Sequence, residues 1–130
     1  MSRPETTKSL KLRAWRAISL FVRKRDKKCV TCGKTDGQLD CGHFFPNTER
    51  NSQLGGNALW YDVRNLNAQC SFNCNRMQSG NLSQYAIYLE KKYGHGILQE
   101  LNTLYQTPKK WTADEIRTIA EKYEILEKKL

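Results

Sequence analysis

The chain has 130 residues, of which 38% are hydrophobic and 27% are charged, with only three prolines. This length and composition are typical of one folded domain rather than a disordered or fibrous chain. No run approaches the roughly 18 apolar residues needed to cross a bilayer, and the opening Met-Ser-Arg-Pro-Glu lacks an apolar signal core. We therefore expect a single domain over residues 1–130, and neither a membrane protein nor a secreted one.

The formal net charge of +9 is concentrated at the N-terminus. Residues 1–28 contain ten Lys and Arg against two acidic residues, a net charge of +8, whereas residues 29–130 carry only +1. A concentrated basic segment is typical of proteins that bind polyanions such as nucleic acids. The alternative is a solvated basic surface that only aids solubility.

Residues 6–26 predict a helix with two distinct faces. When successive residues are placed about 100° apart, the apolar side chains fall on one arc and the basic ones on the other. The two sets are Leu12, Trp15, Ile18, Phe21 and Val22, and Arg13, Arg16, Arg23 and Lys24. We expect the apolar face to pack on the core or on a second subunit, and the basic face to point outward.

Four of the five cysteines form two close pairs, Cys29 with Cys32 and Cys70 with Cys74. Two such pairs, about 40 residues apart, supply four thiolates and predict a tetrahedral structural zinc ion. The second pair has three intervening residues, which lies within the usual range of two to four. Cys41 stands alone, as a replacement ligand or as a free buried thiol.

The remaining pattern predicts an α+β fold. Residues 27–81 lack a helical period and contain two candidate short strands, Gln38–Phe45 and Ala58–Tyr61, joined by a polar loop over 46–56. Residues 82–130 return to helical signals, with expected helices over Leu82–Tyr93, over Ile97–Tyr105, and from a capping box at Thr112 to the C-terminus. The last helix carries an apolar stripe that indicates core or a subunit interface: Ile116, Ile119, Ala120, Tyr123, Leu126 and Leu130.

Polar residues between and beside the cysteines indicate more than a structural metal. Asp40 and His43 lie at the end of the first candidate strand, Asn65 precedes Cys70 by five residues, and Asn75 directly follows Cys74. This pattern resembles the HNH, or ββα-metal, nuclease fold, in which a His and two further His or Asn side chains converge on one divalent metal. The resemblance implies an HNN variant in a small zinc-braced core, flanked by an N-terminal helix and by C-terminal helices.

The resemblance extends over roughly residues 14–130. The order and spacing of several short motifs resemble the NinG/Rap family of phage recombination nucleases: Phe21-Val-Arg-Lys-Arg-Asp26, the CxxCG at Cys29, Asp40-x-Gly-His43, Arg64-Asn65, Gln69-Cys70, Cys74-Asn75, Ser79-Gly-Asn81 and Trp111-Thr112. Membership would imply a structure-selective DNA endonuclease that cuts Holliday junctions and D-loops in the cytoplasm of a bacterial host. One departure is that Gly42, and not the usual acid, stands immediately before His43.

This resemblance gives each candidate residue a role in phosphodiester hydrolysis. His43 would be the general base, since its unperturbed pKa lies near working pH, and Asn65 would orient its ring. Asp40 and Asn75 would hold one Mg²⁺ or Mn²⁺, and the products would be a 5′-phosphate and a 3′-hydroxyl. The alternatives are that His43 is a zinc ligand or a structural histidine, that Asn75 only caps a helix, and that Asp62 is the relevant carboxylate.

We expect DNA to be bound through phosphate contacts, with recognition of shape rather than base sequence. The candidate contacts are Arg13, Arg16, Arg23, Lys24, Arg25, Lys27, Lys28, Arg50, Arg64 and Arg76. A junction has two nearly equivalent strands to cut, so a homodimer built on an apolar helix stripe is the natural arrangement. Two other hypotheses are an HNH endonuclease that acts on ordinary duplex DNA and a non-catalytic zinc module that binds DNA or protein.

Overall fold

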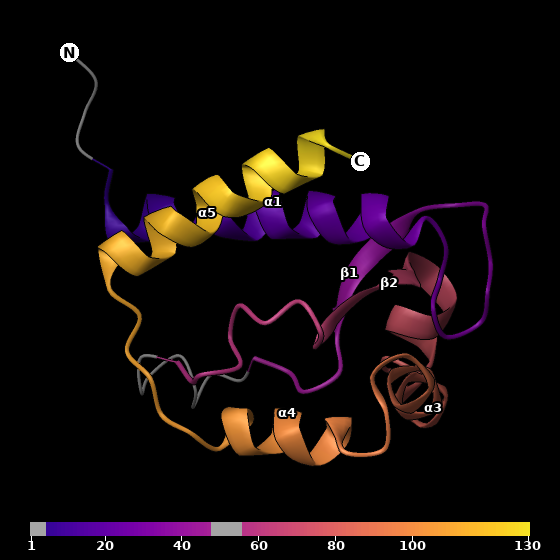
Figure 1. The fold of residues 1–130 in the computed structure, drawn as a ribbon. Helices are drawn as coiled ribbons and strands as arrows, with labels where there is room; N and C mark the ends of the chain where they lie inside the picture. Colours follow the sequence, from indigo (N-terminus) through magenta and orange to yellow (C-terminus); the bar gives the residue numbers. More distant parts are fainter. Residues whose placement is uncertain (1–4, 48–55) are drawn as a thin grey trace.

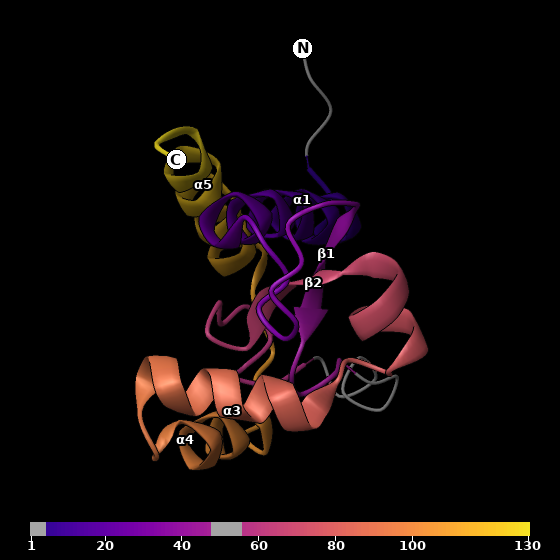
Figure 2. The same cartoon turned by 90° about the vertical axis from the view of Figure 1, so that its right-hand side faces the viewer.

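The computed structural model describes residues 5–47 and 56–130, and their elements form three layers (Figure 1). Two helices form the first layer, a two-stranded antiparallel sheet lies in the middle, and two shorter helices lie on the far side (Figure 2). A π-helix, η1, leads from the sheet to the far layer. In chain order the elements are α1 (Thr7–Asp26), β1 (Leu39–His43), β2 (Leu66–Cys70), η1 (Ser71–Met77), α3 (Leu82–Tyr93), α4 (Ile97–Tyr105) and α5 (Ala113–Lys128).

The helix limits follow from capping chemistry that is visible in the sequence. At the start of α1, Thr6 and Ser9 form a reciprocal capping box, and Thr112 and Glu115 do the same for α5. Each box satisfies two backbone N–H groups that would otherwise have no partner. The expected N-terminal helix and all three expected C-terminal helices are confirmed.

Helices α1 and α5 pack on one another and bury the apolar faces of both. The buried residues of this pair are Leu10, Ala14, Ala17, Ile18 and Val22 from α1, and Ile116, Ala120 and Tyr123 from α5. The α5 stripe therefore contacts α1 of the same chain, which confirms the core alternative, and a subunit interface on its exposed end at Leu130 stays a prediction. Leu12, which was expected on the core face, is 48% exposed.

The sheet differs from the expected one. Strand β1 is shorter than the expected 38–45, and Ala58–Tyr61 is not a strand but a turn whose apolar side chains fill the core. The partner of β1 is Leu66–Cys70, in which all five residues are buried, including the polar Asn67 and Gln69. The face that carries these two polar side chains is covered by η1 and α3.

A second apolar cluster fixes α3 and α4 against the turn before β2. It consists of Leu59, Tyr85, Leu89, Ile97 and Leu101. Within residues 5–47 and 56–130, no helix is both long enough and apolar enough to cross a membrane. The expected loop over 46–56 lies largely outside the described residues.

Candidate functional site

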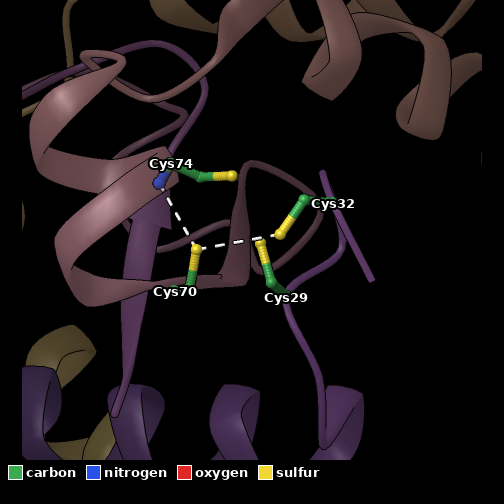
Figure 3. A group of neighbouring side chains, drawn as sticks. All are labelled: Cys29, Cys32, Cys70 and Cys74. Atoms are coloured by element: carbon green, nitrogen blue, oxygen red, sulfur yellow. Dashed lines mark hydrogen bonds between the residues drawn. The ribbon is translucent and has the colours of Figure 1, made fainter. Parts of the chain in front are cut away.

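The two cysteine pairs come together at one end of the sheet (Figure 3). The four Sγ atoms lie within 4.8 Å of one another, and those of Cys32 and Cys70 are 3.8 Å apart. In a tetrahedral site with Zn–S bonds of about 2.3 Å, neighbouring sulfurs are separated by about 3.8 Å. Since none of the cysteines forms a disulfide, Cys29, Cys32, Cys70 and Cys74 could hold a zinc ion.

The three-residue spacing of the second pair is accommodated by the π-helix. Cys70 caps η1, and its Sγ accepts a hydrogen bond from the Cys74 backbone N–H at 3.3 Å. A π-helical turn contains more residues than an α-helical one, so residues four apart in sequence still face the same side. An α-helical turn would also place residues four apart on one side, so the spacing and the cap hydrogen bond bring Cys74 to the cluster.

The thiol pKa values differ, and not according to membership of the cluster, since burial raises the pKa of Cys32 to about 12. Burial opposes ionisation of Cys29, but hydrogen bonds from the Thr31 side chain and from neighbouring backbone groups outweigh it and lower the pKa to about 6. Cys41 lies outside the cluster, and burial raises the pKa of its thiol to about 12. The alternative that Cys41 is a free buried thiol is confirmed.

His43 stands at the end of β1 on the face of the sheet that contacts α1. Its imidazole stacks on the indole of Trp15, with ring centroids 5.3 Å apart and planes 10° apart. The Nε2 atom is shielded from solvent and has no hydrogen-bond partner among the described residues. Burial lowers the pKa below the ordinary 6.5, so the ring is neutral near pH 7 and can accept a proton. His43 is not part of the cysteine cluster.

Asn65 holds the backbone that follows His43, not the imidazole itself. Its Oδ1 accepts from the Phe45 N–H and its Nδ2 donates to the Phe45 carbonyl, both at 2.9 Å. The buried Tyr85 hydroxyl donates to the Gly42 carbonyl at 2.8 Å, on the other side of His43. These bonds fix the backbone before and after the histidine.

Asp40 and Asn75 meet on the opposite face of the sheet. The Asn75 Nδ2 donates to Asp40 Oδ2 at 2.8 Å, so Asn75 does not cap a helix. Side chains alternate along a strand, so Asp40 faces η1 whereas His43 faces α1. The expected convergence of His43, Asn65 and Asn75 on one point is therefore wrong. Asp62 does not replace Asp40, because both of its carboxylate oxygens bind the Arg64 guanidinium.

Gly42 lies where the HNH acid was expected, and the space beside it is filled by Gln69. A Cβ atom added at Gly42 would overlap the Gln69 Oε1 and lie 3.0 Å from its Cδ. Gln69 is wholly buried, and its Nε2 donates to the Gly80 carbonyl at 2.6 Å. A side chain at position 42 is therefore excluded by close packing across the sheet.

The basic candidates fall into two groups. Four have their charge taken up within the chain: Arg13 by Glu5 and Glu124, Lys24 by Glu127, Arg64 by Asp62 and Glu100, and Arg25 by Asp26. Arg25 also donates to the backbone carbonyls of Val63 and Leu66 and so ties α1 to β2. The other basic candidates form no ion pair with any residue that the structure describes. They are Arg16, Arg23, Lys27, Lys28 and Arg76, whereas Arg50 lies outside the described residues.

Sequence reasoning missed three residues that shape the site, namely Trp15, Gln69 and Tyr85. Trp15 was assigned only to the apolar face of its helix, Tyr85 carried no motif, and Gln69 was noted only as the residue before Cys70 and was given no role. A buried glutamine facing a glycine across two strands is visible only once the register of β1 and β2 is known.

Comparisons with known proteins agree on one family. A profile described as "NinG: Bacteriophage Lambda NinG protein" matches residues 5–130. The chain is similar to proteins named "Protein ninG" from Escherichia phage 933W, Salmonella phage P22 and Escherichia phage lambda. The identities over 114 residues are 32%, 31% and 30%, which covers 85% of this chain in each case.

The chain spans about half the length of these curated relatives, between 52% and 53%. No solved structure matches it significantly.

Proposed function

Because the chain belongs to the NinG family, matched over residues 5–130, we propose that it is a metal-dependent endonuclease that cuts branched DNA such as Holliday junctions and D-loops. The observation that carries this proposal is the state of His43. Its Nε2 is shielded and unpartnered, its pKa is lowered, and it borders a cavity of about 290 Å³. Such a histidine is suited to take a proton from a water molecule that enters the cavity.

In the proposed reaction, the His43 imidazole removes a proton from a water molecule in the adjoining cavity as the water oxygen attacks the phosphorus. The P–O3′ bond breaks, which leaves a 5′-phosphate and a 3′-hydroxyl. Stacking on Trp15 restricts the ring, while Asn65 and Tyr85 hold the backbone on either side of the histidine. A fixed base orientation contributes to catalysis because no reorganisation is needed during the reaction.

Asp40 and Asn75 are the residues that would hold a divalent cation. With the Asn75 Nδ2 bonded to Asp40, the amide and carboxylate oxygens that remain are the hard ligands that Mg²⁺ and Mn²⁺ prefer. A cation held there would neutralise charge on a DNA phosphate that contacts this face of the sheet. Because this pair lies on the sheet face away from His43, we assign it no part in the proton transfer.

The DNA contacts in this proposal come from the basic residues without internal ion pairs. They are Arg16 and Arg23 on α1, Lys27 and Lys28 just after it, and Arg76 on η1. Contacts of this kind attract phosphate and carry no base code. We retain a symmetric dimer as part of the proposal, because two equivalent sites match two strands, and its place of action would be the cytoplasm of the bacterial host.

The test is cleavage of a labelled four-way junction in Mg²⁺ by the wild-type protein, by His43→Ala and by His95→Ala. His95, the only other histidine, is exposed between α3 and α4 and serves as a matched control. Loss of a general base lowers the rate by about 10²- to 10⁴-fold, and we expect that loss for His43→Ala alone, with junction affinity and zinc content unchanged.

Cleavage by His43→Ala at the wild-type rate would overturn the catalytic assignment. A wild-type protein that binds the junction but never cuts it would support the non-catalytic zinc module. Competition between a junction and a linear duplex of equal length, at fixed salt, distinguishes branch selectivity from ordinary duplex cleavage.

A further inference from the structure

Two adjoining cavities lie beside His43, and the larger is the one that borders the imidazole in the proposed reaction. The larger, of about 290 Å³, is lined by Lys11, Trp15, His43, Asn47, Trp60 and Tyr61. The smaller, of about 140 Å³, shares Lys11, Trp60 and Tyr61 and adds Lys110 and Trp111 among its lining residues. Since the chain has three tryptophans, all of its indoles line these two cavities.

The tryptophans are positioned by the segment before β2 and by the segment before α5. An antiparallel bridge joins Asn57 to Pro108, and the Trp111 Nε1 donates to the Asn57 carbonyl at 2.9 Å. Gly56 lies between two indoles, since an added Cβ would lie 3.4 Å from Trp111 and 3.5 Å from Trp60. Segments about 50 residues apart in sequence therefore build one aromatic wall.

The positive charge of the side chains that line the two cavities favours an anionic ligand. The described side chains around both cavities include Lys11 and Lys110 and no carboxylate. Flat aromatic side chains next to lysines are the features that bind single-stranded nucleic acid, because bases stack on the rings and phosphates pair with the ammonium groups. The larger cavity has the volume of a small ligand pocket, which begins at about 300 Å³.

We propose that these cavities form a subsite for one unstacked nucleobase of a DNA strand. The proposal rests on the proposed function insofar as DNA is the substrate. His43 lines the larger cavity, so a base lodged there brings its own phosphodiester next to the imidazole. Bases can leave the stack easily at branch points and only at a cost within intact duplex, so the subsite provides a physical basis for branch selectivity.

The experiment measures intrinsic tryptophan fluorescence while the zinc-loaded wild-type protein is titrated without added Mg²⁺ or Mn²⁺. The two probes are a short oligothymidylate and an abasic strand of equal length and charge. We expect quenching by the oligothymidylate and a dissociation constant about 5- to 100-fold lower than for the abasic strand, as stacking of one base predicts. Lys11→Ala should weaken binding of both strands, whereas Lys8→Ala, an exposed lysine of the same helix that lines neither cavity, should not.

Equal affinity for the two strands, or no change in fluorescence on oligothymidylate binding, would overturn the subsite. Trp60→Leu, checked for folding by circular dichroism and zinc content, should remove the preference for the base-containing strand. Junction cleavage without any base preference would reject the subsite and leave the nuclease proposal standing. A base preference in a protein that never cleaves DNA would support the subsite and reject only the nuclease.

Discussion

Replacing Gly42 with alanine tests the packing that places a glycine, and not an acid, immediately before His43. The added Cβ would overlap the Gln69 Oε1 and lie 3.0 Å from Cδ and 3.2 Å from Cγ. Gln69 has no free direction in which to move, because it is wholly buried and its Nε2 is bonded to the Gly80 carbonyl at 2.6 Å. The strands or this hydrogen bond must therefore give way.

The expected cost combines two terms. Overpacking a closed interior costs about 1–3 kcal/mol, and leaving a buried carbonyl without its donor costs about 1–3 kcal/mol more. Gly42→Ala should therefore lower the free energy of unfolding by about 2–6 kcal/mol. Gly96→Ala is the control, because its added Cβ meets nothing within 4 Å, and it should cost less than about 1 kcal/mol.

The assay is urea unfolding of the zinc-saturated protein, followed by circular dichroism. The double variant Gly42→Ala/Gln69→Ala removes the clash, so its destabilisation should fall short of the sum of the single variants by at least about 1 kcal/mol. The argument that Gln69 occupies the space beside Gly42 would be refuted by either of two results. One is a double variant whose loss of unfolding free energy equals the sum of the losses in the single variants, and the other is a loss for Gly42→Ala as small as that for Gly96→Ala.

Three further predictions concern the metal, the histidine and the basic surface. Wild-type protein should bind one zinc ion per chain. Cys32→Ser should bind no zinc, and its free energy of unfolding should be lower by about 3 kcal/mol, which corresponds to roughly 10 °C in Tm. Full metal content in that variant would contradict the four-cysteine site. Because burial lowers the pKa of His43 below 6.5, its neutral form stabilises the fold above that pH, and this stability is lost as pH falls through the folded pKa. Urea midpoints of the wild type should therefore drop more between about pH 7 and pH 5 than those of His43→Gln, and parallel curves would disprove the shift. Replacing both Arg16 and Arg23 with glutamine should reduce the slope of log K for DNA binding against log salt concentration by about 2, at about one per phosphate contact. Arg13→Gln should leave this slope unchanged, because the Arg13 charge is already paired with Glu124. An unaltered slope in the double variant would mean that the basic residues of α1 serve solubility alone.

Much of the local structure could be predicted because it depends on neighbours in sequence. The capping box at Thr112, the glycine that ends α3 and the spacing of the cysteine pairs act over a few residues, and each prediction is confirmed or agrees with the geometry. Local hydrogen bonding and ligand spacing need no knowledge of the distant chain.

The second strand could not be predicted in the same way. Leu66–Cys70 carries Asn67 and Gln69 at alternate positions, a pattern that suggests solvent, yet both are fully buried beneath η1 and α3. Tyr85 and Gly80, from later in the chain, accept hydrogen bonds from the amide N–H groups of Asn67 and Gln69, and such partners favour the burial of polar groups.

The sequence by itself determined the helices, the set of four cysteines that could hold a zinc ion and a basic N-terminal segment. Tertiary structure decided which of those charges remain available, because Glu124 and Glu127 of α5 neutralise Arg13 and Lys24 of α1 across a long gap in sequence. It also decided that His43 and Asp40 face opposite sides of one strand, since strand limits and register set the direction of every side chain. Charge and residue type belong to the sequence, whereas the partners and faces of those residues depend on which distant segments pack against them.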